Sequence, residues 1–242
     1  MFYTTEITDK TAIFSPEEST HIVKALRKKR GSKICFTDGA GFLYEGEIIT
    51  ANVRLVEIRI INIKSPDAAG LPPIHIIVAP TKNIDRIEWF VEKATEVGVA
   101  EISFIVTENS ERRILKTDRL KKIAVSAMKQ SNQLWLPKIN ELTTLQTILN
   151  KAQSFSGGRF FGYCNDESLR KIKKPIPYNE AISKNIPATI LIGPEGDFTE
   201  NEARKCIEAG FSPVVLTKTR LRTETAALFA CWNYAIRHNT DS

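Results

Sequence analysis

The stretch LIGPEGDFTENE, Leu191 to Glu202, places two carboxylates in a glycine turn between an apolar run and the start of a helix. A strand, a glycine turn and a helix together bind phosphate in many folds. Glu195 and Asp197 would repel a phosphate there, and no GxGxxG or GxxxxGK[ST] motif occurs in the chain. We therefore expect either a tight turn without a ligand or a site for a cationic ligand without phosphate. S-adenosylmethionine, with its sulfonium, has this chemistry.

A second stretch, LRTETAALFA, places polar side chains at the start of the last predicted helix. Thr223 or Thr225 can cap this helix, and Glu224 suits the positive end of its dipole. Capping does not explain Arg222. Because ligands in parallel α/β sheets bind beyond the carboxyl ends of the strands, we expect a site formed by GPEGDF, TKTRLRTETA and the GYCND loop that follows Phe161.

Two basic runs indicate a nucleic-acid partner. STHIVKALRKKRGSK contains no acidic residue, and ERRILKTDRLKKIAVSAMKQ is also rich in Arg and Lys. A solvated charged face is the usual meaning of one such run, but two favour a surface that follows a phosphate backbone. The net charge of +6 permits this partner without requiring it.

The elements that position these residues fall into two groups. Residues 1 to 64 read as short strands with period-two patterning, joined in one place by an Asp38-Gly39 hairpin, and they predict a small barrel. One helix interrupts them: Ser15 caps it, Glu18 completes a capping box, and Gly31 ends it.

After a linker, Lys64 to Pro73, apolar strands alternate with amphipathic helices, which predicts an α/β fold with a parallel sheet covered on both faces. A further capping box, Thr199 with Glu202, opens one of these helices, and Gly98 is expected to end another. The predicted domains are 1–68 and 69–242.

Composition excludes several classes of protein. The chain of 242 residues is 42% hydrophobic and 26% charged, and it has no apolar run of bilayer length. No secretory signal is visible, so we expect a cytoplasmic protein. The four cysteines and three histidines show no metal-ligand spacing, so no metal is expected. His75, inside the apolar run IHIIV, reads as a core or edge residue with its hydrogen bonds satisfied.

Five stretches together resemble the 16S ribosomal RNA uridine-N3 methyltransferases of the SPOUT superfamily. HIVKALRKKRGSKICFTDGAGFLYEGEI is similar to the family's His, Leu-Arg, Gly and Asp-Gly pattern. KNIDRIEWFVEKATEVGVAEI resembles its Lys, Arg, Lys-Ala-Thr-Glu and Gly-Val signature, and MKQSNQLWLPKI its Gln-Ser and Pro-x-Ile. IGPEGDFTENE and LRTETAA are the most specific of the five. In this order the motifs cover nearly the whole chain.

The resemblance implies a PUA or OB-like N-terminal barrel, a C-terminal α/β domain tied in a trefoil knot, a methyl donor bound in a bent form, and a homodimer. The implied donor-binding residues are Leu191, Ile192, Gly193, Pro194, Glu195, Gly196, Leu216, Leu221, Arg222, Thr223, Glu224 and Thr225. The residues expected to contact 16S ribosomal RNA, within the assembled small subunit, are His21, Lys24, Arg27, Lys28, Lys29, Arg30, Arg112, Arg113 and Lys129.

The chain departs from the family at three places. Thr217 and Asp197 stand where the family usually or often has Gly, and a Cβ there could crowd the adenine or restrict the loop. Asn132 and Gln133 stand where an Arg is usual.

Transfer to uracil N3 requires loss of the imide proton and stabilisation of the resulting anion. Arg222 or Arg27 could supply the cation, and Glu224 could accept the proton, directly or through water. Two alternatives stay open: a SPOUT enzyme that acts on another RNA position, and a non-catalytic RNA-binding protein on the same scaffold, which Thr217 favours.

Overall fold

The computed structural model describes residues 1–65, 73–163 and 173–239, and the chain divides into two compact units. The first contains Met1–Gly70 together with Val125–Leu136, and the second contains Leu71–Ala124 and Pro137–Ser242. The linker predicted over Lys64–Pro73 lies mostly outside the described residues.

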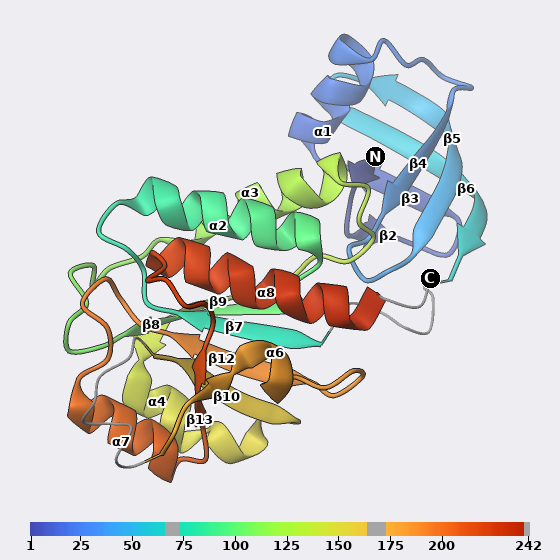
Figure 1. The fold of residues 1–242 in the computed structure, drawn as a ribbon. Coiled ribbons are helices and arrows are strands. Elements are labelled where there is room, and N and C mark those ends of the chain that lie inside the picture. Colours follow the sequence, from blue (N-terminus) through green and yellow to red (C-terminus); the bar gives the residue numbers. More distant parts are fainter. Residues whose placement is uncertain (66–72, 164–172, 240–242) are drawn as a thin grey trace. The chain divides into compact units, whose positions relative to one another are not determined.

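The first unit is a six-stranded sheet with the order β1-β4-β5-β6-β3-β2. Its strands are β1 (Phe2–Tyr3), β2 (Glu6–Ile7), β3 (Thr11–Phe14), β4 (Lys33–Thr37), β5 (Leu43–Asn52) and β6 (Leu55–Lys64). The two edge strands are consecutive in the chain, with Thr4 between them. Its N–H donates to the Thr37 carbonyl at 3.2 Å and its hydroxyl donates to the Ile13 carbonyl at 2.5 Å. These bonds bring both edges together, so the sheet curls as predicted (Figure 1).

The segment Val125–Leu136 completes this first unit, although the sequence placed it in the second domain. The Leu134 carbonyl accepts hydrogen bonds from Gly41 N–H at 2.9 Å and from the Thr37 hydroxyl at 3.1 Å. Leu136 N–H donates to the Gly39 carbonyl at 2.8 Å. The hairpin at Asp38-Gly39 is therefore held by residues almost a hundred positions away.

The helix of the first unit is shorter than predicted. It consists of α1 (Pro16–Thr20) and a π-helical turn, η1 (His21–Ala25). Ser15 Oγ accepts Glu18 N–H at 3.2 Å, as predicted. The second half of the predicted capping box is wrong, because the Glu18 carboxylate pairs with the Lys129 ammonium instead. A charged partner satisfies a carboxylate better than one more backbone amide.

The predicted stop at Gly31 is also wrong. The left-handed residue after the helix is Arg27, with φ 51°, and Lys28 N–H reaches back to the Ile22 carbonyl at 3.1 Å. A π turn follows α1, so the helix ends earlier in the sequence than predicted. Gly31, with φ 85°, instead turns the chain into β4 and donates to the Ile48 carbonyl at 2.8 Å.

The second unit is a seven-stranded sheet in which every pair is parallel, with the order β11-β13-β10-β12-β7-β8-β9. Its strands are β7 (Ile74–Val78), β8 (Glu101–Val106), β9 (Lys138–Thr144), β10 (Gly158–Gly162), β11 (Ile176–Pro177), β12 (Ala188–Ile192) and β13 (Ser212–Val215). Within the described residues, the helices after α1 and η1 are α2 (Ile84–Val97), α3 (Thr117–Gln130), α4 (Leu145–Asn150), η2 (Ala152–Ser154), α6 (Tyr178–Ala181), α7 (Glu200–Glu208) and α8 (Thr223–Asn239).

Helices cover both faces of this sheet, which confirms the predicted α/β fold. Helices α2 and α8 lie side by side over one face, and α4 and α7 lie over the other (Figure 1). Successive side chains of a strand point to opposite faces of the sheet. Ile77, Phe161 and Leu191 point to the face covered by α4 and α7 and pack with them in one core. The trefoil knot stays a prediction, because the strand order does not trace how the chain threads.

Local signals fix two helix ends as predicted. Gly98, with φ 92°, caps α2, and the reciprocal box of Thr199 and Glu202 opens α7 directly after the acidic glycine turn. Across the described residues, no helix is both long and apolar enough to cross a bilayer.

His75 sits in a polar network at the amino ends of β7, β8 and β9. Its Nε2 lies 2.7 Å from Ser103 Oγ and 3.9 Å from Glu101 Oε1, so the predicted satisfied histidine is confirmed. Burial lowers the pKa of His75 to about 4; the nearby Glu101 carboxylate opposes this shift and Lys138 adds to it. The folded chain thus keeps this imidazole neutral well below pH 6.

Acidification should therefore destabilise the sheet through His75. An unfolded histidine has a pKa of about 6.5, so between pH 6.5 and 4 the unfolded chain binds more protons than the folded chain. The free energy of unfolding should fall across that window by up to about 3 kcal/mol. His75→Gln can keep a hydrogen bond to Ser103 but cannot titrate, so urea denaturation at pH 7.5 and 5 should show a smaller loss. His21→Gln, at an exposed histidine, is the control and should lose as much stability as the parent. Equal losses in the parent and in His75→Gln would contradict this role of His75.

Candidate functional site

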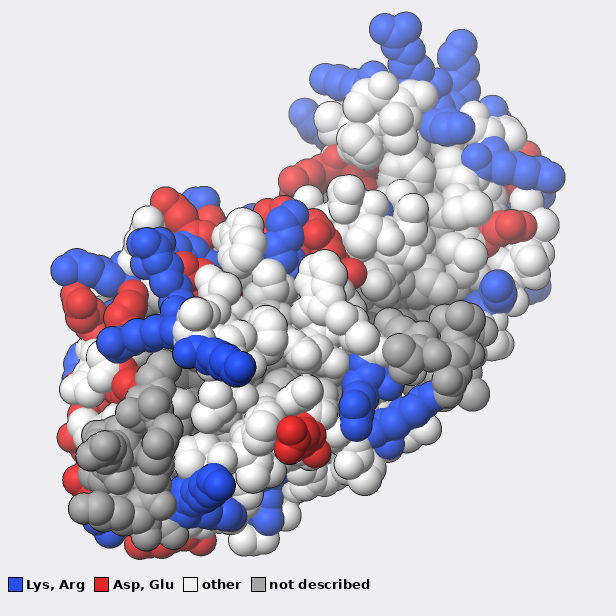
Figure 2. All heavy atoms as spheres, viewed as in Figure 1, with Lys and Arg blue, Asp and Glu red and all other residues white. Residues whose placement is uncertain are grey.

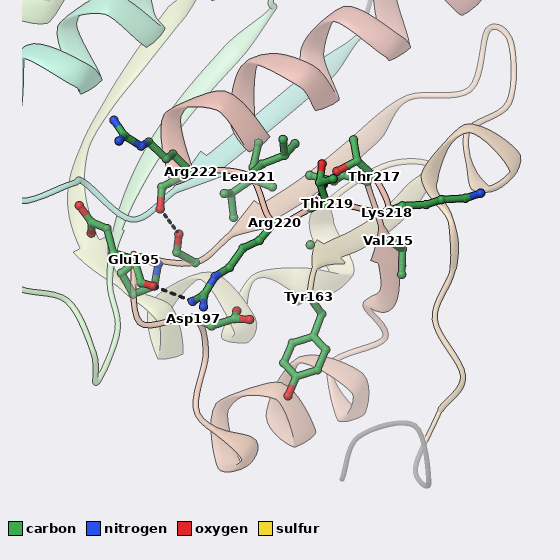
Figure 3. A pocket seen from close by; sticks show the side chains of 17 residues that line it. Tyr163, Glu195, Asp197, Val215, Thr217, Lys218, Thr219, Arg220, Leu221 and Arg222 are labelled. Carbon is green, nitrogen blue, oxygen red and sulfur yellow. Dashed lines mark hydrogen bonds between the residues drawn. The ribbon is translucent and has the colours of Figure 1, made fainter. Parts of the chain in front are cut away.

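A cavity of about 550 Å³ opens beyond the carboxyl ends of β10, β12 and β13, which are neighbours in the sheet (Figure 3). This is the edge at which the sequence predicted a ligand. The residues that line the cavity are Gly162, Tyr163, Ile192, Gly193, Pro194, Glu195, Asp197, Val215, Leu216, Thr217, Lys218, Thr219, Arg220, Leu221, Arg222, Thr223 and Ala226. Glycine turns and apolar side chains form much of its walls, and its charged side chains come from the loops after β12 and β13.

Most of the residues predicted to bind a donor line this cavity. They are Ile192, Gly193, Pro194, Glu195, Leu216, Leu221, Arg222 and Thr223. Leu191, Gly196, Glu224 and Thr225 are not in the lining; Leu191 packs in the core beneath α4 and α7. Residues missed by the sequence reasoning include Tyr163 and Arg220. Both lie in the stretches GYCND and TKTRLRTETA that were expected to form the site, which was the signal for them. Of the predicted GYCND loop, Cys164 to Asp166 lie outside the described residues.

Two glycines of the cavity lining have little room for a side chain. A Cβ on Gly193 would lie 3.2 Å from the Phe198 ring and 3.3 Å from Asp197 Oδ1, and a Cβ on Gly162 would lie 3.1 Å from Ile192 Cδ1. These distances are tighter than ordinary van der Waals contact. Glycine at both positions therefore allows the close packing of the loops around the cavity.

The hydroxyl of Thr223 ties the two wall loops together. Thr223 is the first residue of α8, and its Oγ1 donates to the Gly193 carbonyl at 3.1 Å. Both residues are buried. The glycine turn after β12 and the start of α8 are thus one unit, although thirty residues separate them.

The acidic turn is held from outside the cavity. Lys82 N–H donates to Glu195 Oε1 at 3.2 Å, and the Asn109 amide donates to the carbonyls of Gly196 and Asp197, each at 3.0 Å. Arg112 in turn donates to the carbonyls of Thr81 and Lys82. The loops after β7 and β8 therefore position the glycine turn and satisfy part of its negative charge.

The two departures from glycine are accommodated differently. Asp197 has φ 61°, the left-handed backbone that favours glycine, and its Oδ1 accepts the Phe198 N–H at 2.8 Å. Thr217 is not left-handed, and its hydroxyl donates to the Thr219 carbonyl at 2.6 Å. Thr217 therefore stabilises its own loop and does not strain it.

Glu224 is buried on the side of α8 that faces α2. Its Oε1 lies 3.8 Å from Arg86 Nε, and its Oε2 is buried without a hydrogen-bond partner in the described part of the chain. Arg86 was not among the predicted site residues. Arg222, two residues earlier, is exposed and lines the cavity.

The two basic runs differ in how free their cations are. In the second run, Arg112 and Arg113 donate to backbone carbonyls of neighbouring loops, and Lys129 pairs with Glu18. In the first run, His21, Lys24, Arg27, Lys29 and Arg30 are exposed and Lys28 is partly exposed. Figure 2 shows Lys and Arg side chains gathered at the end of the first unit where α1 lies in Figure 1.

A curled barrel followed by a parallel sheet with a cavity at its carboxyl edge defines a two-part protein with the architecture of SPOUT methyltransferases. Residues 69–234 match the RNA methyltransferase domain family, and residues 14–61 match the RNA methyltransferase PUA domain. The chain belongs to the RNA methyltransferase domain family.

Curated relatives and solved structures agree with this assignment. "Ribosomal RNA small subunit methyltransferase E" of Bacillus subtilis is 28% identical over 220 residues, which cover 88% of this chain and 85% of that protein. A "probable rRNA-methyltransferase" from Porphyromonas gingivalis is 34% identical, with a TM-score of 0.88 over 100% of this chain and 99% of the other. A ribosomal RNA small subunit methyltransferase E from Neisseria gonorrhoeae, bound to S-adenosyl methionine, is 26% identical, with a TM-score of 0.77 over 95% and 94%.

The left-handed backbone of Arg27 yields a stability prediction. An L-residue in this conformation costs roughly 1–2 kcal/mol, which exceeds the entropic penalty of glycine. Arg27→Gly should therefore raise the free energy of unfolding of the first unit by up to about 1 kcal/mol. Arg30→Gly, in the same run but without a positive φ, should lower it by roughly 0.5–1 kcal/mol. Thermal and urea denaturation of both variants measure this, and equal losses in the two would contradict the assigned strain.

Proposed function

We propose that this protein transfers a methyl group from S-adenosylmethionine to N3 of a uridine in 16S ribosomal RNA of the small ribosomal subunit. One observation carries the proposal: the two most specific motifs, GPEG and LRTETA, meet as the walls of one cavity through the Thr223–Gly193 hydrogen bond. The names of the curated relatives and the S-adenosyl methionine bound in the Neisseria gonorrhoeae structure support it.

The cavity fits the proposed donor in size and chemistry. A volume of about 550 Å³ lies within the range for small-molecule sites. Gly162 and Gly193 in the lining carry no side chain, and Leu216 and Leu221 are apolar, which suits the flat rings of an adenosine. Carboxylates at Glu195 and Asp197 disfavour a phosphate but not a sulfonium. When bound, S-adenosylmethionine supplies an electrophilic methyl group.

Residues 1–68, which form most of the first unit, are the proposed RNA-binding domain. Its exposed cations at Lys24, Arg27, Lys29 and Arg30 suit a phosphate backbone. An arginine is kept at position 27, where the backbone favours glycine. This combination supports a contact between the Arg27 guanidinium and RNA. Arg112, Arg113 and Lys129 have intramolecular partners, so their proposed RNA contacts are weaker candidates.

Arg222 is the proposed cation for the uracil anion. It is exposed at the cavity, so its guanidinium can face a base brought there, and negative charge develops on the uracil oxygens as the imide proton leaves. Arg27 is the second candidate. Glu224 is the proposed proton acceptor through a water molecule, because its carboxylate does not line the cavity. Its unpartnered Oε2 leaves acceptor capacity for such a water.

A homodimer is the proposed assembly. Trp89 on α2 and Trp232 and Ile236 on α8 are 43%, 53% and 52% exposed on two helices that pack side by side. Exposed aromatic and aliphatic side chains on adjacent helices are typical of a protein interface. We propose that a second copy covers them. The proposed substrate places the protein in the cytoplasm.

Transfer of labelled methyl groups tests the proposed function. Purified small ribosomal subunits, incubated with the protein and methyl-labelled S-adenosylmethionine, should incorporate label into 16S ribosomal RNA, and large subunits should not. Donor binding without label in either subunit would favour another RNA substrate. Saturable RNA binding without donor binding would favour the non-catalytic alternative.

Arg222→Ala should lower the single-turnover methylation rate by roughly a hundredfold, the loss typical of one missing anion-stabilising donor. Donor affinity should change much less, because the interaction forms as the uracil loses its proton. Arg204→Ala on α7, which removes another exposed arginine of the second unit, is the matched control. Rates that fall equally in both variants would contradict this role.

Glu224→Gln separates proton transfer from helix capping. The amide keeps the shape of the side chain but is a poor base, so the methylation rate should fall near neutral pH and recover as pH rises and the imide ionises by itself. A constant ratio of variant to parent rates at every pH would make Glu224 a structural residue.

A further inference from the structure

Arg220 lies at the cavity but has no role in the proposed methyl transfer. Its Nη2 donates to the Glu195 carbonyl at 3.2 Å, so the loop after β13 meets the glycine turn after β12 a second time. Figure 3 shows the Arg220 side chain extending toward Glu195 and Asp197, whereas Lys218 on the same loop extends away from them. A cation is therefore positioned beside two acidic residues on one cavity lining.

The bond that Arg220 makes leaves most of its capacity unused. It uses one N–H of a guanidinium and reaches a neutral carbonyl, not a carboxylate. The Glu195 carboxylate instead accepts Lys82 N–H from the neighbouring loop. Arg220 is exposed, and it stays close to the glycine turn through this hydrogen bond. It can thus bind a second acceptor in the cavity without moving its loop.

We propose that Arg220 forms a subsite for the zwitterionic amino-acid end of the ligand, an inference that rests on the proposed donor. The guanidinium binds the α-carboxylate, and the negative charge of Glu195 and Asp197 complements the α-ammonium. An RNA phosphate is the competing ligand for an exposed arginine. The two acidic residues beside Arg220 oppose a phosphate but match a zwitterion.

The subsite predicts which ligands the cavity distinguishes. S-adenosylhomocysteine and 5′-methylthioadenosine share the adenosine and an uncharged thioether, and only the first carries an amino-acid end. The ratio of their affinities therefore isolates this end without the sulfonium charge. In the parent protein, S-adenosylhomocysteine should bind more tightly than 5′-methylthioadenosine.

Calorimetry with both ligands tests the proposal on the full-length chain. Arg220→Ala should weaken the affinity for S-adenosylhomocysteine by about tenfold, the loss expected for one charge-assisted hydrogen-bonded pair. It should leave the affinity for 5′-methylthioadenosine unchanged. Arg220→Lys, which keeps the charge but loses the planar fork, should lie between parent and alanine variant. Arg204→Ala, the matched control on α7 outside the cavity lining, should change neither affinity.

Three results would overturn the subsite. An equal loss for both ligands in Arg220→Ala would mean that Arg220 shapes the loop for any adenosine. Unchanged affinity for both ligands, with weaker RNA binding, would assign Arg220 to a phosphate. A parent protein that binds neither ligand would overturn the proposed donor and this subsite with it, whereas the first two results leave the donor intact.

Discussion

One buried hydrogen bond, from Thr223 Oγ1 to the Gly193 carbonyl, holds together the two loops on which the site depends. The parallel order of β12, β10 and β13 makes this contact possible, because their carboxyl ends meet at one edge. An unmade bond here would leave a buried carbonyl unsatisfied, at a cost of about 1–3 kcal/mol. Thr223 is also the first residue of α8, so one residue both starts the helix that covers the sheet and lines the cavity.

The carboxylates of the acidic turn, Glu195 and Asp197, limit which ligands the cavity can bind. Glu195 and Asp197 would be costly beside a phosphate, yet both are held by amides from other loops or from the turn itself. Asn109 fixes the carbonyls of the same turn from the loop after β8. These contacts hold the acidic side of the cavity in place, which suits a cationic or zwitterionic nucleoside better than a nucleotide.

Periodicity and local capping predicted the alternation of strands and helices, the helix end at Gly98 and the Thr199 box, because these features depend on neighbours in the chain. Two strands of the parallel sheet, β9 and β11, were not predicted. Contacts between distant residues were beyond those signals. The first helix differs from the prediction because Lys129 pairs with Glu18 and because a π turn, His21–Ala25, precedes the left-handed Arg27. For the site, strand ends and two motifs located the cavity, but the hydrogen bonds of Arg112 and the neighbour Arg86 of Glu224 depend on how separate loops and helices pack.

The central claim is the transfer of a methyl group to uridine N3, and identification of the product nucleoside tests it most directly. Small subunits from cells that lack this protein would be treated with the purified protein and S-adenosylmethionine, and their 16S ribosomal RNA digested to nucleosides for mass spectrometry. The account predicts 3-methyluridine, absent before treatment and mapped to a single position. A methylated nucleoside of another kind, or 16S ribosomal RNA unchanged by treatment, would contradict it.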